Sequence, residues 1–124
     1  MKAILLVALG GALGSVLRYG AGEWLPFLRS SSGFPWATML VNLSGCLLIG
    51  IAAGLMAKYE VFTSNFRLFF VVGFCGGFTT FSTFSREILQ MLCQNMYLQA
   101  IVYVLMSIVA GLTLTFVGYF ALKT

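Results

Sequence analysis

Residues 73–85 read GFCGGFTTFSTFS, and the polar character of this stretch limits how the chain can fold. It holds three glycines and five hydroxyl-bearing residues in the middle of a long apolar segment. A bilayer has no water at that depth to solvate such groups, so they are tolerated only where protein buries them or where they line a path for something polar. We therefore interpret residues 73–85 as a candidate permeation site.

Four apolar stretches are long enough to cross a bilayer. They are Ala3–Ala21, Pro35–Ala57, Phe66–Cys93 and Tyr97–Leu122. The second, as a helix, would be about 34 Å long, which matches a hydrocarbon core of about 30 Å. The composition agrees, because 60% of the residues are hydrophobic and 8% are charged, with a mean hydropathy of +1.02. We predict an all-α membrane protein with four transmembrane helices in a single domain over residues 1–124.

The third apolar stretch is too long and too interrupted for one regular helix. Gly73, Gly76 and Gly77 weaken the helix, and the hydroxyls of Thr79 and Thr80 can bond nearby carbonyls instead. We predict that this helix is broken midway into two half-helices. Such a break leaves free N–H and C=O groups near the middle of the membrane, where they can hold an ion by backbone alone.

The positive charges of the loops are nearly balanced across the predicted spans. Lys2, Lys58, Arg67 and Lys123 fall on one side, and Arg18, Arg29 and Arg86 fall on the other. Because orientation follows the Lys and Arg bias of short loops, this balance predicts insertion in both directions. Two inverted copies can pair about a two-fold axis in the membrane plane, so we predict an antiparallel homodimer.

Glycine spacing predicts close helix packing. GxxxG patterns occur at Gly10/Gly14, Gly50/Gly54 and Gly73/Gly77. Small residues at this spacing let helix backbones approach each other, but glycine is common in membrane helices and the pattern identifies no particular partner.

The ionisable residues argue against an enzyme or a side-chain metal site. The chain has no His, and its acidic residues are three isolated glutamates, Glu23, Glu60 and Glu87. The three cysteines, Cys46, Cys75 and Cys93, lack metal-like spacing and are expected to be small buried residues. No nucleophile has a histidine or acidic partner nearby in sequence, and no basic run indicates nucleic acid.

Polar residues recur on one face of the second and of the fourth span. Thr38 and Asn42 lie one turn apart in the second span, and Tyr103, Ser107 and Gly111 form a stripe in the fourth. Asn42 fits either an interhelical hydrogen bond or an ion-facing donor. The stripe of the fourth span fits ordinary packing unless it faces the hydroxyl cluster of the broken helix.

Two aromatic and two charged residues complete the candidates. Phe81 and Phe84 share a helix face, and their positively polarised ring edges can face an anion. Arg18 fits snorkelling to the interface, a vestibule that gathers anions, or both together. Glu87 follows Arg86 directly and fits a solvated pair at a helix end.

The combination of motifs closely resembles the Fluc (CrcB-like) family of small fluoride channels over essentially the full chain. The resemblance rests on Gly11, Gly14, Arg18 and Tyr19, on Thr38, Val41, Asn42 and Gly45, on residues 73–85, and on Glu87. It implies a dual-topology antiparallel homodimer with two anion pores and a structural sodium ion (Na+) at the dimer centre. The sequence departs from the family pattern at Ala37, where glycine is usual, and at Arg86, which adds a cation beside Glu87.

The resemblance also implies roles for individual residues. Carbonyls of Gly76 and Thr79 would hold the sodium ion, and Arg18 and Glu87 would belong to the vestibule. The implied fluoride pore comprises Asn42, Phe81, Phe84, Ser82, Thr83, Ser107, Tyr103 and Thr38.

The implied activity is passive release of cytosolic fluoride through the inner (plasma) membrane of a bacterium. Hydroxyls, an amide and ring edges suit fluoride because a passive pore must replace its hydration shell with closely spaced donors. A small dual-topology multidrug transporter is the nearest alternative, but it would need a membrane-embedded carboxylate in the first span, where Glu23 lies only at the end. A structural membrane subunit is the other alternative.

Overall fold

The structure is a computed structural model that describes residues 1–24, 34–59 and 64–123. Over this part of the chain every regular element is a helix. Four helical segments are long and apolar enough to cross a membrane: Lys2–Trp24, Trp36–Lys58, Ser64–Cys93 and Tyr97–Lys123. The predicted all-α fold with four spans is therefore confirmed. Arg29 and Glu60, which entered the sequence argument, lie outside the described residues.

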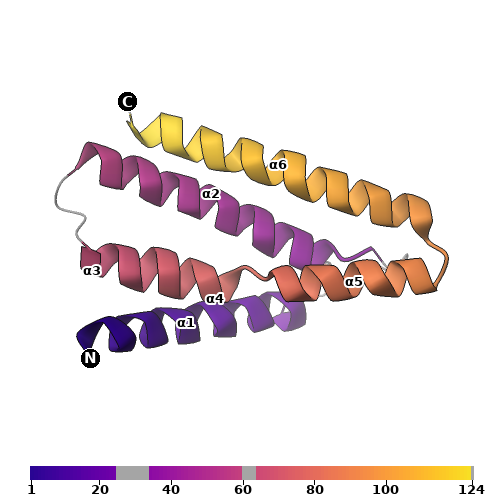
Figure 1. Ribbon diagram of the computed structural model, residues 1–124, viewed down its shortest axis with the longest axis horizontal. Helices are drawn as coiled ribbons and strands as arrows, with labels where there is room; N and C mark the ends of the chain where they lie inside the picture. Colours follow the sequence, from indigo (N-terminus) through magenta and orange to yellow (C-terminus); the bar gives the residue numbers. More distant parts are fainter. Residues whose placement is uncertain (25–33, 60–63, 124) are drawn as a thin grey trace.

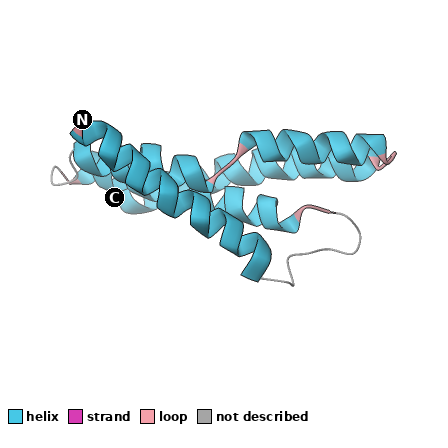
Figure 2. Ribbon diagram, turned by 90° about the horizontal axis from the view of Figure 1, so that it is seen from below, coloured by secondary structure: helices cyan, strands magenta, loops and turns pink. Residues whose placement is uncertain are grey.

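The third segment consists of several successive elements, whereas each other span is one helix (Figure 1). The single helices are α1 (Lys2–Trp24), α2 (Trp36–Lys58) and α6 (Tyr97–Lys123). The third segment runs through α3 (Ser64–Phe66), the π-helix η2 (Arg67–Cys75), α4 (Gly76–Phe78) and α5 (Phe81–Cys93). Figure 2 shows the short loop between α4 and α5 in pink. Both ends of the chain lie at the same end of the molecule in Figure 1.

The spans pack in two pairs, α1 against η2 with α4, and α2 against α6. Glycines bring the backbones of each pair together. A Cβ added to Gly73 would lie 2.9 Å from Val7 O and 3.1 Å from Gly10 Cα, and one added to Gly118 would lie 2.9 Å from Ile51 N. The GxxxG glycines therefore serve contacts within this chain.

Two threonines end one helix and begin the next. Thr79 and Thr80 have extended backbone, with ψ of 157° and 119°. The Thr79 amide and hydroxyl both donate to Cys75 O, at 2.9 and 2.8 Å. Thr80 is the N-cap of α5, because its hydroxyl accepts from Thr83 N at 3.2 Å. Both helix ends thus find the polar partners that a membrane interior would not supply.

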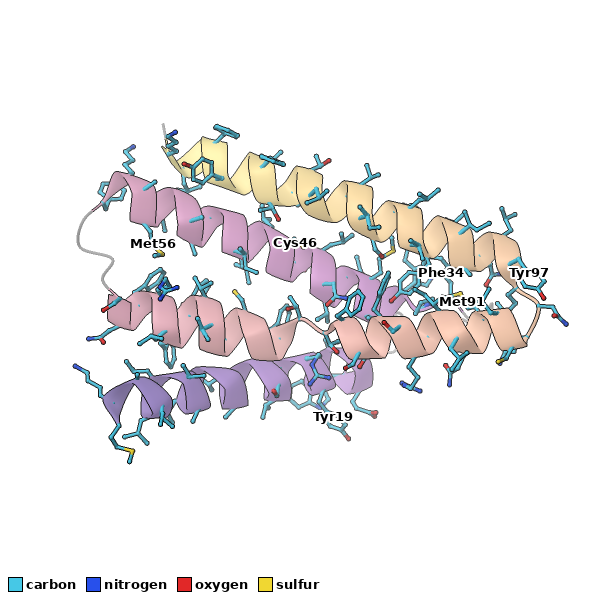
Figure 3. All side chains as sticks on the ribbon, in the orientation of Figure 1. Tyr19, Phe34, Cys46, Met56, Met91 and Tyr97 are labelled. Carbon is cyan, nitrogen blue, oxygen red and sulfur yellow. The ribbon has the colours of Figure 1, made fainter. Side chains whose placement is uncertain are left out.

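A small apolar core lies where α2, α5 and α6 meet. Met39, Met91, Ala100 and Tyr103 are buried there, and Phe34 packs against them. Phe34 and Met91 are labelled in Figure 3. The outward faces of α1 and α6 are instead apolar and exposed in the single chain, as a lipid environment permits.

Candidate functional site

Asn42 on α2 binds the extended backbone between α4 and α5. Its side-chain oxygen accepts from Thr80 N at 2.9 Å, and its Nδ2 donates to Thr80 O at 3.2 Å. This pair satisfies the Thr80 N–H, which no helix pairs, and adds a donor to the Thr80 carbonyl, which also begins α5 as the N-cap. The interhelical hydrogen bond expected as one reading of Asn42 is confirmed. Because an amide nitrogen carries two hydrogens, one donor of Asn42 remains for another acceptor.

A groove of about 290 Å³ lies on one side of this bond. Its lining combines polar groups from three elements with two phenyl rings. The lining residues are Asn42, Cys46, Ile49, Thr79, Thr80, Phe81, Phe84, Ser107 and Ile108. The Ser107 hydroxyl is buried and has no hydrogen-bond partner among the described residues. Buried hydroxyls are usually paired, so this unpaired oxygen, on a residue that lines the groove, is a candidate donor to a ligand there.

The two phenylalanines of α5 differ in exposure. Their ring centroids lie 5.8 Å apart with planes inclined by 39°. Phe84 packs against Tyr103, with centroids 4.8 Å apart, whereas Phe81 is 79% exposed in the single chain. Phe84 is therefore anchored to the core, while Phe81 stands at the open side of the groove.

A polar cavity of about 330 Å³, here called the vestibule, also borders Thr80. Its lining residues are Arg18, Tyr19, Gly22, Glu23, Ala37, Thr38, Val41, Thr80, Thr83, Arg86 and Glu87. Thr80 lines both the vestibule and the groove. Thr80, which Asn42 holds, is thus the residue that the two linings share, and the Asn42–Thr80 pair is here called the partition.

Glu87 connects three helices. One carboxylate oxygen accepts from the Thr38 hydroxyl at 3.0 Å, and the other accepts from the Tyr103 hydroxyl at 3.1 Å. Glu87 lies in the middle of α5 and is half-buried. The expectation of a solvated pair at a helix end is therefore wrong, because the approach of α2 and α6 brings two hydroxyl donors to this carboxylate.

Arg18 is held by the backbone of the third segment. Its Nε donates to Gly77 O at 3.1 Å. Arg18 does not close the first span, since α1 continues to Trp24. The side chain therefore reaches inward to α4 and lines the vestibule.

The structure divides the remaining candidates between these cavities and other places. Thr38 and Thr83 lie in the vestibule. Tyr103 is fully buried beneath Phe84 and lines neither cavity. Ser82 is exposed, and its hydroxyl lies 3.3 Å from Thr80 Oγ1. Gly76 is also exposed and lies outside both linings.

The stripe on α6 splits between two neighbours. Tyr103 and Ser107 face α5, whereas Gly111 faces α2, where an added Cβ would lie 3.2 Å from Cys46 Sγ. Reasoning from sequence missed the partition role of Thr80 and the place of Cys46 in the groove. For Thr80, the only signal in the sequence was the pair Thr79–Thr80 shortly after Gly76 and Gly77. No pattern in the sequence indicated that Cys46 would line the groove.

The comparisons with known proteins agree with one another. The family described as "CrcB-like protein, Camphor Resistance (CrcB)" matches residues 5–119. A relative from Helicobacter acinonychis, named fluoride-specific ion channel FluC, is 47% identical over 121 residues, covering 96% of this chain and 94% of its own. Relatives of the same name from Thermus thermophilus and Azobacteroides pseudotrichonymphae are 47% and 43% identical over 93% and 96% of this chain, and 89% and 94% of their own.

These matches, together with the four spans, place the chain in the bacterial plasma membrane as a multi-pass protein. The relatives carry the name of an ion channel and not of an enzyme. The match covers both cavities and the partition. The chain belongs to the CrcB-like family.

Proposed function

We propose that this protein is a fluoride-selective passive channel that releases cytosolic fluoride. The observation that carries the proposal is the groove beside the extended backbone, in which a buried Ser107 hydroxyl without a partner lies among phenyl rings. The names of the relatives support fluoride as the transported ion. The gradient of fluoride and the membrane potential suffice to drive such release.

The lining chemistry suits a small, strongly hydrated anion. The Ser107 hydroxyl and the second amide hydrogen of Asn42 are donors that replace lost water. The edges of Phe81 and Phe84 carry partial positive charge and add a weak attraction. Because none of these groups is a full positive charge, an ion bound to them is able to leave again.

Fluoride passes from the vestibule to the groove at the Asn42–Thr80 partition. Thr38 and Thr83 supply hydroxyls on the vestibule side. Ser82 and Tyr103 support this path from outside both cavities, since the Ser82 hydroxyl contacts Thr80 Oγ1 and the Tyr103 hydroxyl donates to Glu87. Glu87 fixes Thr38 and Tyr103 in place by accepting from both hydroxyls.

A second copy of the chain completes each groove. Phe81 is 79% exposed in the single chain, although it borders the proposed path of an ion. An inverted copy would cover this open side and give two pores in one antiparallel homodimer. The near balance of Lys and Arg across the spans supports the presence of both orientations. In this arrangement the third segment acts as a transmembrane helix broken midway.

The broken segment also suits a structural sodium ion. Thr80 N, which would pair with Gly76 O in a continuous helix, donates to Asn42 instead. The extended Thr79 offers its own carbonyl beside it. Oxygen ligands of this kind suit a hard cation, so Gly76 and Thr79 would hold sodium by their carbonyls. The bound charge would lower the cost of bringing an anion into a medium of low dielectric.

Fluoride efflux from liposomes tests the proposal. Purified protein is reconstituted, and a fluoride electrode follows efflux beside a chloride control. We expect rapid efflux of fluoride alone, and its loss in Phe81→Ile. Phe116→Ile is the matched control, because Phe116 lies on α6 and is 59% exposed outside both cavities. If folded wild-type protein leaves fluoride trapped, a multidrug transporter or a structural subunit is the better description.

A further inference from the structure

Four charged side chains line the vestibule. They are Arg18, Arg86, Glu23 and Glu87. Their formal charges cancel, since two guanidinium groups face two carboxylates. Without Arg86 the same lining would carry a net negative charge, which repels anions.

The four groups are not equally tied to the protein. Arg18 donates its Nε to Gly77 O, and Glu87 accepts hydrogen bonds with both of its oxygens. Both therefore occupy fixed positions near the partition. Arg86 is exposed on α5, directly beside Glu87 in sequence, at the rim of the same cavity.

We propose that Arg86 is the anion-recruiting residue of the vestibule, and that it sets the rate at which fluoride reaches the pore. This inference rests on the proposed function. Without Arg86 the net negative lining would lower the local concentration of anions, and Arg86 removes this repulsion; the net charge of a cavity with low-dielectric walls changes ion arrival by about 10-fold or more in favourable cases. Arg86 changes how fast fluoride arrives at the vestibule. It does not line the groove, so it does not determine which ion the groove selects.

Efflux at two ionic strengths tests this role. We expect Arg86→Gln to slow the initial fluoride efflux by about 3- to 10-fold at low salt, and Arg86→Lys to retain the wild-type rate. Near 1 M salt, where the Debye length is about 3 Å, the difference should fall below about 2-fold. Arg67→Gln, on exposed η2 away from the vestibule, is the matched control. An Arg86→Gln rate equal to wild type at low salt, or equally slowed at both salt levels, overturns the proposal.

A second experiment measures the electrostatic potential of the vestibule and does not require fluoride transport. Ala37 lines the cavity and is replaced by Cys in a background where Cys93 is Ser. The ratio of its reaction rates with an anionic and a cationic methanethiosulfonate reagent reports the local charge. We expect Arg86→Gln to lower this ratio by about 3-fold or more. An unchanged ratio overturns the role of Arg86, whereas a lowered ratio in a protein that conducts no fluoride refutes only the channel.

Discussion

The paired spans and α5 are held in place by different means. In the pairs α1 with η2 and α2 with α6, glycines allow backbone to touch backbone over most of the membrane depth. Helix α5 makes far fewer contacts and is tied instead by side-chain hydrogen bonds, from Thr38 and Tyr103 to Glu87. Backbone packing thus dominates in the pairs, where Arg18 and Thr115 add hydrogen bonds to Gly77 O and Cys46 O, whereas α5 depends mainly on polar side chains.

Removing the amide of Asn42 should break the polar region most severely. Asn42→Ala leaves the Thr80 N–H without its partner, at a cost of about 1–3 kcal/mol, and removes the side-chain donor to Thr80 O, which still accepts the first bond of α5. We expect fluoride efflux to be lost and the backbone amide of Thr80 to exchange its hydrogen faster. Asn65→Ala, on the exposed α3, should change neither. If Asn42→Ala releases fluoride at the wild-type rate, the Asn42–Thr80 pair is not required for permeation.

A single added methyl group tests the paired spans. In Gly14→Ala the new Cβ would fall 2.7 Å from Phe78 N, closer than packed atoms allow. We expect a loss of about 1–3 kcal/mol of stability, measured as a lower unfolding temperature in detergent. Gly22→Ala in the same helix meets nothing within 4 Å and should be neutral or stabilising. Equal effects of the two changes would show that backbone contact does not hold α1.

The Tyr103 hydroxyl can be removed without removing the ring, so it tests the polar attachment of α5 separately from its packing. Tyr103→Phe keeps the packing on Phe84 but takes one donor from Glu87, at a cost of about 0.5–1.5 kcal/mol. We expect efflux to slow a few-fold while the unfolding temperature changes little. Tyr97→Phe, whose hydroxyl donates to Asn95 on the surface, is the control. If Tyr103→Phe conducts fluoride at the wild-type rate, the hydrogen bond from Tyr103 to Glu87 is not needed for permeation.

The turn between α5 and α6 should give the smallest effect. Asn95 has φ of 59°, in the left-handed region. Asn95→Ala should cost about 1 kcal/mol of stability, whereas Asn95→Gly should be neutral within about 0.5 kcal/mol. Thermal unfolding measures both. Neither change should alter efflux, since the turn lies outside both cavities, and a conduction defect would contradict that separation.

Sequence reasoning predicted the frame better than the site. Apolar runs specify spans directly, so the second was expected at residues 35–57 and is found at Trp36–Lys58. The bond from Arg18 to Gly77 O and the two donors to Glu87 join residues 16 to 59 positions apart. Their formation depends on how helices rotate against each other, which hydrophobic pattern alone does not specify. The π-helical winding of η2 likewise leaves no distinct pattern of apolar residues.

The position of the two chain ends has a consequence for joining copies. Both termini lie at the same end of the molecule (Figure 1), because the chain crosses the membrane an even number of times. Two copies fused directly in tandem would therefore insert with the same orientation and could not form an inverted pair. A fused version of an inverted pair needs one additional crossing in the linker. Under the proposed inverted pairing, gene duplication alone would thus join two copies that cannot pair with each other until such a crossing was acquired.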